Sequence, residues 1–187
     1  MSTETDLGRE VIEVPKGVSF AVAHGVLTAK GKLGEIQRPF PTDALELAAA
    51  AGSVTLTLRV PVHRKRHQAL LRTWAAHVRN LGLGLTNGVE AKMKVVAAHF
   101  PMKVAVKGEE LVIENFLGEK HPRSTRLVPG TKAAVEGEFV LLSGHDVEQV
   151  GQSAANIERV TRIRDYDPRV FQDGIYLVER AHLKEAS

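Results

Sequence analysis

Apolar and polar residues alternate along several short stretches of this chain, which is the pattern of half-buried β-strands. The alternation is strict in Ser53–Val60, where every second residue is Val or Leu. It recurs in Val18–Val22 and Val104–Val106, and Ala133–Leu142 has the apolar composition of a further strand. Glycines and prolines between these stretches predict turns, so most of the chain is expected to form short strands connected by hairpins.

A first helix is expected at about residues 64–80, where apolar residues recur every three or four positions. These apolar positions are Leu70, Trp74, Val78 and Leu81. Gly82-Leu-Gly84 and Asn87-Gly88 follow the helix directly. A phosphate-binding glycine loop lies between a strand and the start of a helix, so these glycines are expected instead to end the helix and form a turn.

A second helix is expected at about residues 146–159, with Asp146 as its N-cap and Gln149 completing a capping box. Its predicted apolar face consists of Val147, Val150, Ala154 and Ile157.

The chain also contains an internal repeat, because Val11–Phe40 and Val95–Arg123 share the same order of features. In both, a short apolar strand ends in a proline, an alternating strand and a glycine turn follow, and Leu-Gly-Glu comes after the next strand. The landmarks are Pro15 and Pro101, Gly25 and Gly108, and Leu-Gly-Glu at 33–35 and 117–119. Each half therefore predicts several strands, one helix and further strand.

The hairpin order implies antiparallel pairing, so the expected fold class is α+β, a tandem duplication of a small domain with one helix packed on a sheet. The expected organisation is an N-terminal tail at 1–9, a first repeat at 10–91, a second repeat at 92–180 and a C-terminal tail at 181–187.

The composition is that of an ordinary globular protein, with 187 residues, 43% hydrophobic and 25% charged. Cysteine is absent, which excludes disulfides, iron–sulfur clusters, thiolate zinc sites and a cysteine nucleophile. No apolar run has the length of a membrane span and the first residues do not form a secretory signal. A soluble, cytoplasmic protein without a membrane partner is expected.

Basic residues are clustered, although the net charge is only +3. Residues 1–93 contain 12 basic and 8 acidic residues, and residues 94–187 contain 13 and 14. The clusters are Arg64-Lys65-Arg66, Lys120 to Arg126, and Arg159, Arg162, Arg164 and Arg169. Clustering of this kind is typical of a surface that binds a polyanion.

Two groups of residues have the composition of metal sites, but their neighbours in the sequence disfavour a metal ion. His63 and His67 have helical ligand spacing, yet three cations lie between them and would repel a divalent ion. Asp165, Asp167 and Asp173 alternate with arginines, which favours salt bridges and turn capping. No catalytic set can be identified, and neither a metal nor a cofactor is expected.

The first helix carries the most informative charge pattern. Arg64, Lys65 and Arg66 crowd its N-terminus, where the helix dipole is already positive, and Lys65, Arg72 and Arg79 form a stripe at seven-residue spacing. This arrangement is unfavourable in isolation and becomes favourable when a polyanion covers it. The two interpretations are a solvated basic face and a nucleic-acid contact, and the second is favoured.

Several longer motifs resemble those of a known family. They are VPKGV (Val14–Val18), GKLGE (Gly31–Glu35), HFPM (His99–Met102), NFLGEKHPR (Asn115–Arg123) and RDYDPRVFQDGIYLV (Arg164–Val178). Together the chain closely resembles the sixth protein of the large ribosomal subunit, the L-six family, in the branch shared by archaea and eukaryotes. The fold of that family, a duplicated small α+β domain, agrees with the repeat.

The resemblance implies a non-enzymatic constituent of the large subunit that binds large-subunit rRNA near the stalk base and the sarcin–ricin loop. It implies neighbouring ribosomal proteins as partners, transient proximity to translation factors, and a role in bracing the site where those factors dock. The RNA-facing segments carried over from the family are Asn115–Arg123 and Arg162–Arg169. The expected rRNA-binding residues, including those inferred from charge alone, are Arg64, Lys65, Arg66, Arg72, Arg79, Lys120, Arg123, Arg126, Arg162, Arg164 and Arg169.

The aromatic and aliphatic residues of these motifs are expected to be core or loop anchors, so the protein should recognise RNA backbone and shape. These residues are Phe116, Phe171, Ile175 and Tyr176. Two other function classes remain as alternatives, a free-standing RNA-binding regulator and, less favoured, a metal-dependent hydrolase.

Overall fold

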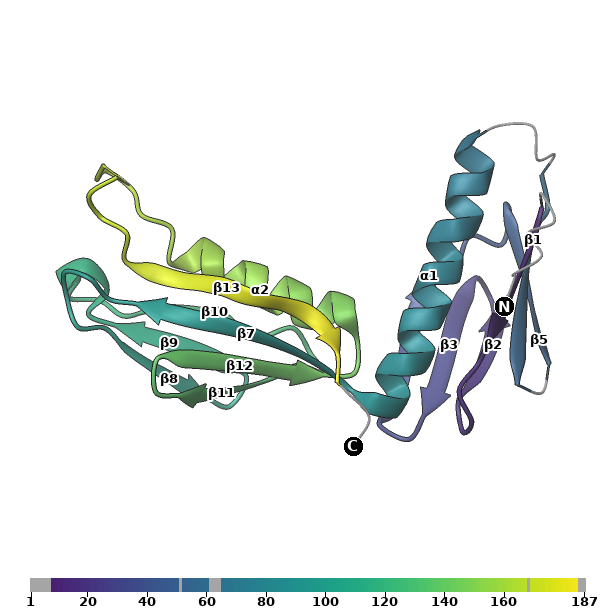
Figure 1. Ribbon diagram of the computed structural model, residues 1–187, viewed down its shortest axis with the longest axis horizontal. Helices are drawn as coiled ribbons and strands as arrows, with labels where there is room; N and C mark the ends of the chain where they lie inside the picture. Colours follow the sequence, from purple (N-terminus) through teal and green to yellow (C-terminus); the bar gives the residue numbers. More distant parts are fainter. Residues whose placement is uncertain (1–7, 51, 61–64, 168, 185–187) are drawn as a thin grey trace. The chain divides into compact units, whose positions relative to one another are not determined.

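The structure is a computed structural model that describes residues 8–50, 52–60, 65–167 and 169–184. The chain divides into two compact units, Met1–Asn87 (unit 1) and Gly88–Ser187 (unit 2) (Figure 1). In the part of the chain that the structure describes, the paired strands of each unit are antiparallel and each unit carries one α-helix. This confirms the α+β class.

Unit 1 consists of two three-stranded sheets and a long helix. Its elements are β1 (Arg9–Glu13), β2 (Ser19–Ala23), β3 (Val26–Gly31), β4 (Gly34–Pro39), β5 (Leu45–Ala50), β6 (Ser53–Leu58) and α1 (Lys65–Asn87). One sheet has the order β1-β6-β5 and the other β2-β3-β4. The strict alternation of Ser53–Val60 correctly predicted β6, whose Val54, Leu56 and Leu58 are buried.

Helix α1 is longer than predicted, because it continues through Gly82 and Gly84 to Asn87. The expectation that Gly82-Leu-Gly84 ends the helix is therefore wrong. A Cβ built on Gly82 would lie 3.2 Å from Cδ of Pro15, so the glycine permits close packing where a side chain would be crowded. That packing outweighs the cost of about 1 kcal/mol for a glycine inside a helix. The turn comes at Gly88, which has a φ of 83°.

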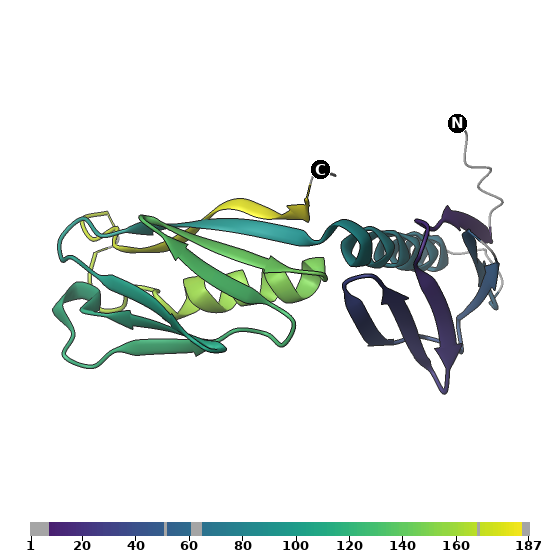
Figure 2. The same cartoon turned by 90° about the horizontal axis from the view of Figure 1, so that it is seen from below.

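Unit 2 consists of a four-stranded sheet, a three-stranded sheet and one α-helix (Figure 2). Its elements are β7 (Val89–Val96), β8 (Lys103–Lys107), β9 (Glu110–Glu114), the short 3-10 helix η1 (Phe116–Gly118), β10 (Arg123–Arg126), β11 (Lys132–Glu136), β12 (Phe139–Gly144), α2 (Val147–Val160) and β13 (Gly174–Leu183). The sheets have the orders β11-β12-β7-β13 and β10-β9-β8. The strand expected at Ala133–Leu142 is in fact the β11–β12 hairpin, which turns at Gly137 with a φ of 59°.

Helix α2 lies close to its predicted position, and Val150, Ala154 and Ile157 are buried as expected. Asp146 is its N-cap and accepts a hydrogen bond from the Glu148 amide at 2.9 Å. The expected capping box is wrong, because Oε1 of Gln149 is buried without a hydrogen-bond partner and the side chain packs over Gly130 instead.

The two units share one order of elements, a strand, a three-stranded meander, a hairpin and a helix. Further strand after the helix was expected in both halves, and this is wrong for unit 1. The strand that follows α1 is β7, which pairs with β12 and β13 of unit 2. Strand β1 begins at Arg9 and β13 ends at Leu183, so both strands extend into segments expected to be tails.

Candidate nucleic-acid interface

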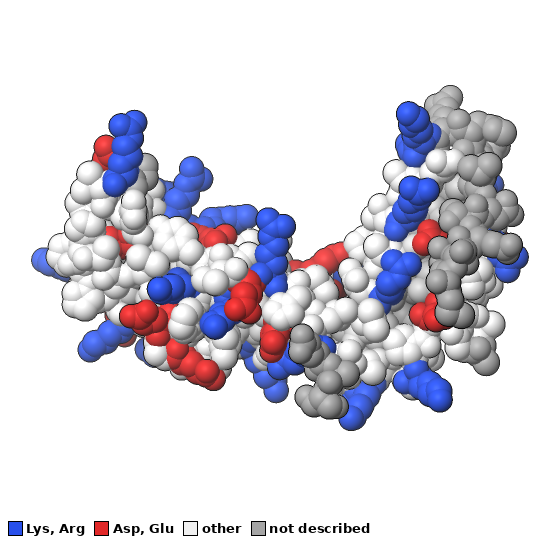
Figure 3. All heavy atoms as spheres, in the orientation of Figure 1, with Lys and Arg blue, Asp and Glu red and all other residues white. Residues whose placement is uncertain are grey.

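The exposed side of α1 carries a row of basic side chains (Figure 3). Lys65, Arg66 and Arg72 are exposed, and so is Arg79, whose guanidinium lies 3.7 Å from a carboxylate oxygen of Glu10. Arg64 lies outside the described residues. The helix contains no acidic residue, so nothing within it offsets the repulsion between these cations and the helix N-terminus. We call Lys65, Arg66, Arg72 and Arg79 the α1 stripe.

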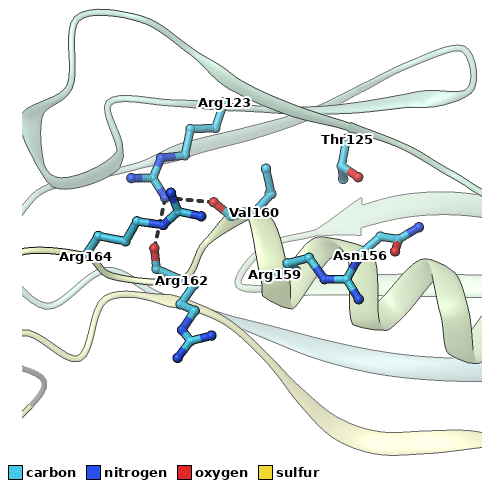
Figure 4. Close-up of a pocket in the computed structure, with 7 residues that line it drawn as sticks. All are labelled: Arg123, Thr125, Asn156, Arg159, Val160, Arg162 and Arg164. Carbon is cyan, nitrogen blue, oxygen red and sulfur yellow. Dashed lines mark hydrogen bonds between the residues drawn. The ribbon is translucent and has the colours of Figure 1, made fainter.

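Unit 2 brings arginines from two segments around one hollow, which we call the arginine cleft. It has a volume of about 470 Å³, and the residues that line it are Arg123, Thr125, Asn156, Arg159, Val160, Arg162 and Arg164. Arg123 and Thr125 come from β10, and the others from the end of α2 and the chain after it (Figure 4). None of the described residues lining it is acidic. An open hollow lined by guanidinium groups has the geometry and charge to bind phosphate.

Arg123 is the fixed wall of this cleft. Its Nε and Nη2 donate to the two carboxylate oxygens of Glu119 at 2.8 and 2.5 Å. Its Nη1 donates to the carbonyls of Val160 at 2.7 Å and Arg162 at 3.2 Å, as the dashed lines in Figure 4 show. The guanidinium also lies 4.2 Å from the ring centroid of the buried Phe116. All three guanidinium nitrogens of Arg123 therefore bind the protein, so this residue joins β10 to the end of α2.

The charge of Glu119 is part of this arrangement. The hydrogen bonds from Arg123, followed by the attraction of its positive charge, lower the pKa of Glu119 below its ordinary 4.5 despite the opposing effect of burial. A carboxylate that stays ionised keeps the arginine in one orientation.

Arg162 and Arg164 also line the cleft, and both are exposed. Arg159 lines it as well but was not among the predicted binding residues, and neither were Thr125 and Asn156. Asn156 and Arg159 are three residues apart on a helix and therefore share a face, which is the sequence signal that could have found them.

The remaining predicted residues are not among those lining the cleft. Lys120, Arg126 and Arg169 are all exposed. The amide of Arg169 donates to Oδ1 of Asp167 at 2.9 Å, which confirms turn capping by that aspartate. Pro168 lies outside the described residues.

A buried carboxylate holds the loop next to the cleft. Asp173 is 1% exposed and accepts hydrogen bonds from the His99 amide at 2.9 Å and from its Nδ1 at 2.7 Å. Burial, the largest single influence, raises the pKa of Asp173, but the hydrogen bonds and electrostatic attraction of His99 and a hydrogen bond from the Ala98 backbone together hold the pKa below 3.8. A salt bridge between this aspartate and a nearby arginine was expected. Asp173 instead bonds to His99 and thereby connects the QDGIY motif to the HFPM motif.

The aromatic residues divide between core and surface. Phe116 and Ile175 are buried, as predicted. Phe171 is half-buried and contacts the rings of His99 and Tyr166, with centroid distances of 4.6 and 4.7 Å. Tyr176 is 45% exposed and therefore not a core residue, but its hydroxyl donates to the Gln172 carbonyl, which fits the expected alternative of a loop anchor.

Within the described ranges, no three His, Asp or Glu side chains come together as a metal site. His63 lies outside those ranges, and His67 accepts a hydrogen bond from Nε of Arg66 at 3.2 Å. None of the helices in the described part of the chain has the length and apolar character to cross a membrane.

The relatives found by comparison with known proteins all belong to one family of ribosomal proteins. Residues 100–174 match the family model described as ribosomal protein L6. The large ribosomal subunit protein uL6 of Methanosarcina mazei is 45% identical over 170 residues, 91% of this chain and 96% of the relative. The uL6 proteins of Methanobrevibacter smithii (43% over 172 residues) and Methanospirillum hungatei (46% over 171) cover 92% and 91% of this chain, and 96% of each relative.

Proposed function

The chain belongs to the ribosomal protein L6 family, and from that premise we propose that it binds large-subunit rRNA chiefly through the arginine cleft. Like its relatives, the protein is a constituent of the large ribosomal subunit and not an enzyme. In our proposal it lies near the stalk base and the sarcin–ricin loop, beside other ribosomal proteins of the cytoplasmic subunit. There it braces the RNA that forms the docking site of translation factors.

The observation that carries this proposal is the convergence of Arg159, Arg162 and Arg164 beside the fixed Arg123. The positive charges of the arginines that line this hollow repel one another, and a phosphate bound there relieves the repulsion. Arginine suits this role because its planar fork can hold two phosphate oxygens at once. Phosphate contacts position a protein on RNA without reading its sequence, which fits a bracing role.

The α1 stripe supports a second and weaker RNA contact. Its side chains project from a single helix, α1. Such charges attract the RNA backbone but do not fix its position.

Hydroxyl-radical footprinting on protein-free large-subunit rRNA tests the proposal. The full-length chain should protect a limited set of riboses near the stalk base and the sarcin–ricin loop, and Arg159→Ala with Arg162→Ala and Arg164→Ala should remove most of that protection. Protection that persists in this triple variant would contradict the role of the cleft. Sucrose-gradient sedimentation separates a subunit constituent, which tracks the large subunit stoichiometrically, from a free-standing regulator.

A further inference from the structure

A second hollow of unit 2 shares Arg159 and Arg162 with the arginine cleft. Its volume is about 640 Å³. Unlike the cleft, it has two aromatic rings in its wall, those of Phe171 and Tyr176, and one carboxylate, that of Glu158. The side chain of Arg162 points away from Arg123 (Figure 4), although its carbonyl accepts a hydrogen bond from Arg123.

The ring of Tyr176 is exposed and held in place. Its hydroxyl donates to the Gln172 carbonyl at 3.1 Å. Its ring lies against Gly174, where an added Cβ would be 3.1 Å from Cζ of the tyrosine. Only a glycine at 174 lets the ring lie this close to the backbone. A fixed aromatic ring that is 45% exposed offers a flat stacking surface. Because its side chain is already restricted in the free protein, little conformational entropy is lost when a ligand stacks on it.

The wall formed by Phe171 is also fixed. This side chain is in contact with the rings of His99 and Tyr166, and His99 is itself bound to the buried Asp173. The aromatic part of the hollow is therefore anchored to the core of unit 2.

Glu158 adds a hydrogen-bond acceptor of defined direction. Its Oε1 accepts from the Leu177 amide at 2.9 Å, which orients the carboxylate between α2 and β13. A carboxylate accepts hydrogen bonds and, when ionised, donates none. It therefore favours a group that presents amino hydrogens over one that presents carbonyl oxygens.

We propose that this hollow binds one unstacked nucleobase with an exocyclic amino group, adenine, cytosine or guanine, from the same RNA whose phosphates occupy the arginine cleft. The inference rests on the proposed function, since the cleft must bind RNA for the neighbouring hollow to receive a base. A nucleotide joins an anionic phosphate to a flat, hydrogen-bonding base, and here a cationic hollow adjoins an aromatic one across two shared arginines. Single bases that leave the helical stack are commonly recognised by aromatic rings together with polar groups. Uracil has no exocyclic amino group and flanks its only Watson–Crick donor, the ring N3–H, with two carbonyl oxygens, so Glu158 favours the other three bases over it.

The test is base-specific chemical probing of protein-free large-subunit rRNA with the full-length chain. Dimethyl sulfate reports on adenine and cytosine, kethoxal on guanine, and a carbodiimide on uracil, and hydroxyl radicals report on the backbone in the same samples. The variants are Tyr176→Leu, which removes the ring, and Tyr176→Phe, a matched control that keeps it. Circular dichroism of each variant verifies the fold.

With the natural chain and Tyr176→Phe, we expect one adenine, cytosine or guanine beside the backbone footprint to change reactivity. With Tyr176→Leu that change should disappear while the backbone footprint remains, and affinity should fall about five-fold or more, the low end of the range for losing one base stack. A retained backbone footprint with the same base reactivities for the natural chain and Tyr176→Leu would overturn the base site alone. Absence of any backbone footprint from the natural chain would instead overturn the proposed function.

Discussion

The two units carry similar numbers of basic residues on surfaces of different kinds. The α1 stripe projects from one helix, and of the contacts described above only the approach of Arg79 to Glu10 joins it to a strand. In the arginine cleft, residues from β10 and from the end of α2 line one hollow, and Arg123 is bound on all three of its nitrogens. Charge alone therefore does not define a binding site. What distinguishes unit 2 is that its backbone topology brings guanidinium groups together and holds one of them still.

The arginines of the two units also differ in how much they contribute to the stability of the fold. In unit 2, removal of Arg123 leaves the Val160 and Arg162 carbonyls and the Glu119 carboxylate without their partner. In unit 1, no hydrogen bond or ion pair joins Arg72 to another of the described residues, so its removal leaves no such group there without a partner. The same substitution should thus have different consequences in the two units.

Arg123→Ala is expected to give the largest effect, a loss of about 2–3 kcal/mol in the free energy of unfolding of unit 2. Hydrogen bonds to a charged group contribute about 1.5–3 kcal/mol each, and part of that loss is offset by water. Urea unfolding followed by far-ultraviolet circular dichroism measures it. Trp74, the only tryptophan, reports on unit 1 by fluorescence and should show little change.

Arg72→Ala is the matched control in unit 1, and it should change stability by no more than about 0.5 kcal/mol. Arg123→Lys keeps the charge but not the planar fork, so it should fall between the two alanine variants. Equal stabilities for Arg123→Ala and Arg72→Ala would contradict the structural role of Arg123.

Acidification should affect unit 2 through Asp173. Its pKa is lowered in the folded state relative to 3.8, so its contribution to stability is complete above that value and is lost as the pH falls through the lower folded-state pKa. Asp173→Asn should cost about 1–2 kcal/mol at neutral pH and should remove this part of the acid dependence. Urea unfolding at pH 7 and at a series of values below pH 4 measures both effects. An unchanged acid profile in Asp173→Asn would show that other carboxylates govern it.

Arg169→Lys is expected to reduce affinity for large-subunit rRNA by about 1 kcal/mol, because lysine keeps the charge but cannot hold a phosphate with two parallel hydrogen bonds. Filter binding at fixed salt measures it. Equal affinity would mean that this exposed arginine faces solvent in the complex.

The smallest effect is expected from Lys65→Ala with Arg66→Ala at the start of α1. Removing two cations from the positive end of the helix dipole should leave the free energy of unfolding unchanged or raise it by up to about 1 kcal/mol. The melting temperature should accordingly stay level or rise slightly. Differential scanning calorimetry measures it. A clear loss of stability would show that contacts of these side chains, such as the hydrogen bond from Arg66 to His67, outweigh the repulsion.

Much of the fold was predictable because hydrophobic periodicity is a local property. Strict alternation located β6, and the spacing of Val150, Ala154 and Ile157 located α2. The end of α1 was missed because Gly82 stays in the helix through contacts with Pro15 and Phe20, which are distant in sequence.

The candidate site was predictable only in part, for the same physical reason. Clustering pointed to Arg159 together with Arg162 and Arg164, but the family resemblance covered only the last two. Including Arg159 in the site required knowledge of which face of α2 meets β10. The structural role of Arg123 depends on carbonyls 37 and 39 residues further along the chain. No local pattern encodes those contacts.

The salt dependence of rRNA binding tests the central claim most directly, by comparing two variants that each lose three positive charges. One is Arg159→Ala with Arg162→Ala and Arg164→Ala in the cleft, and the other is Lys65→Ala with Arg66→Ala and Arg72→Ala in the α1 stripe. Each phosphate contact contributes about 0.7–0.9 to the slope of log affinity against log salt. The cleft variant should lower the slope by about 2–3 and the stripe variant by about 1 or less. An equal decrease in both, or a larger one for the stripe, would contradict the claim that convergence and not charge alone makes the binding site.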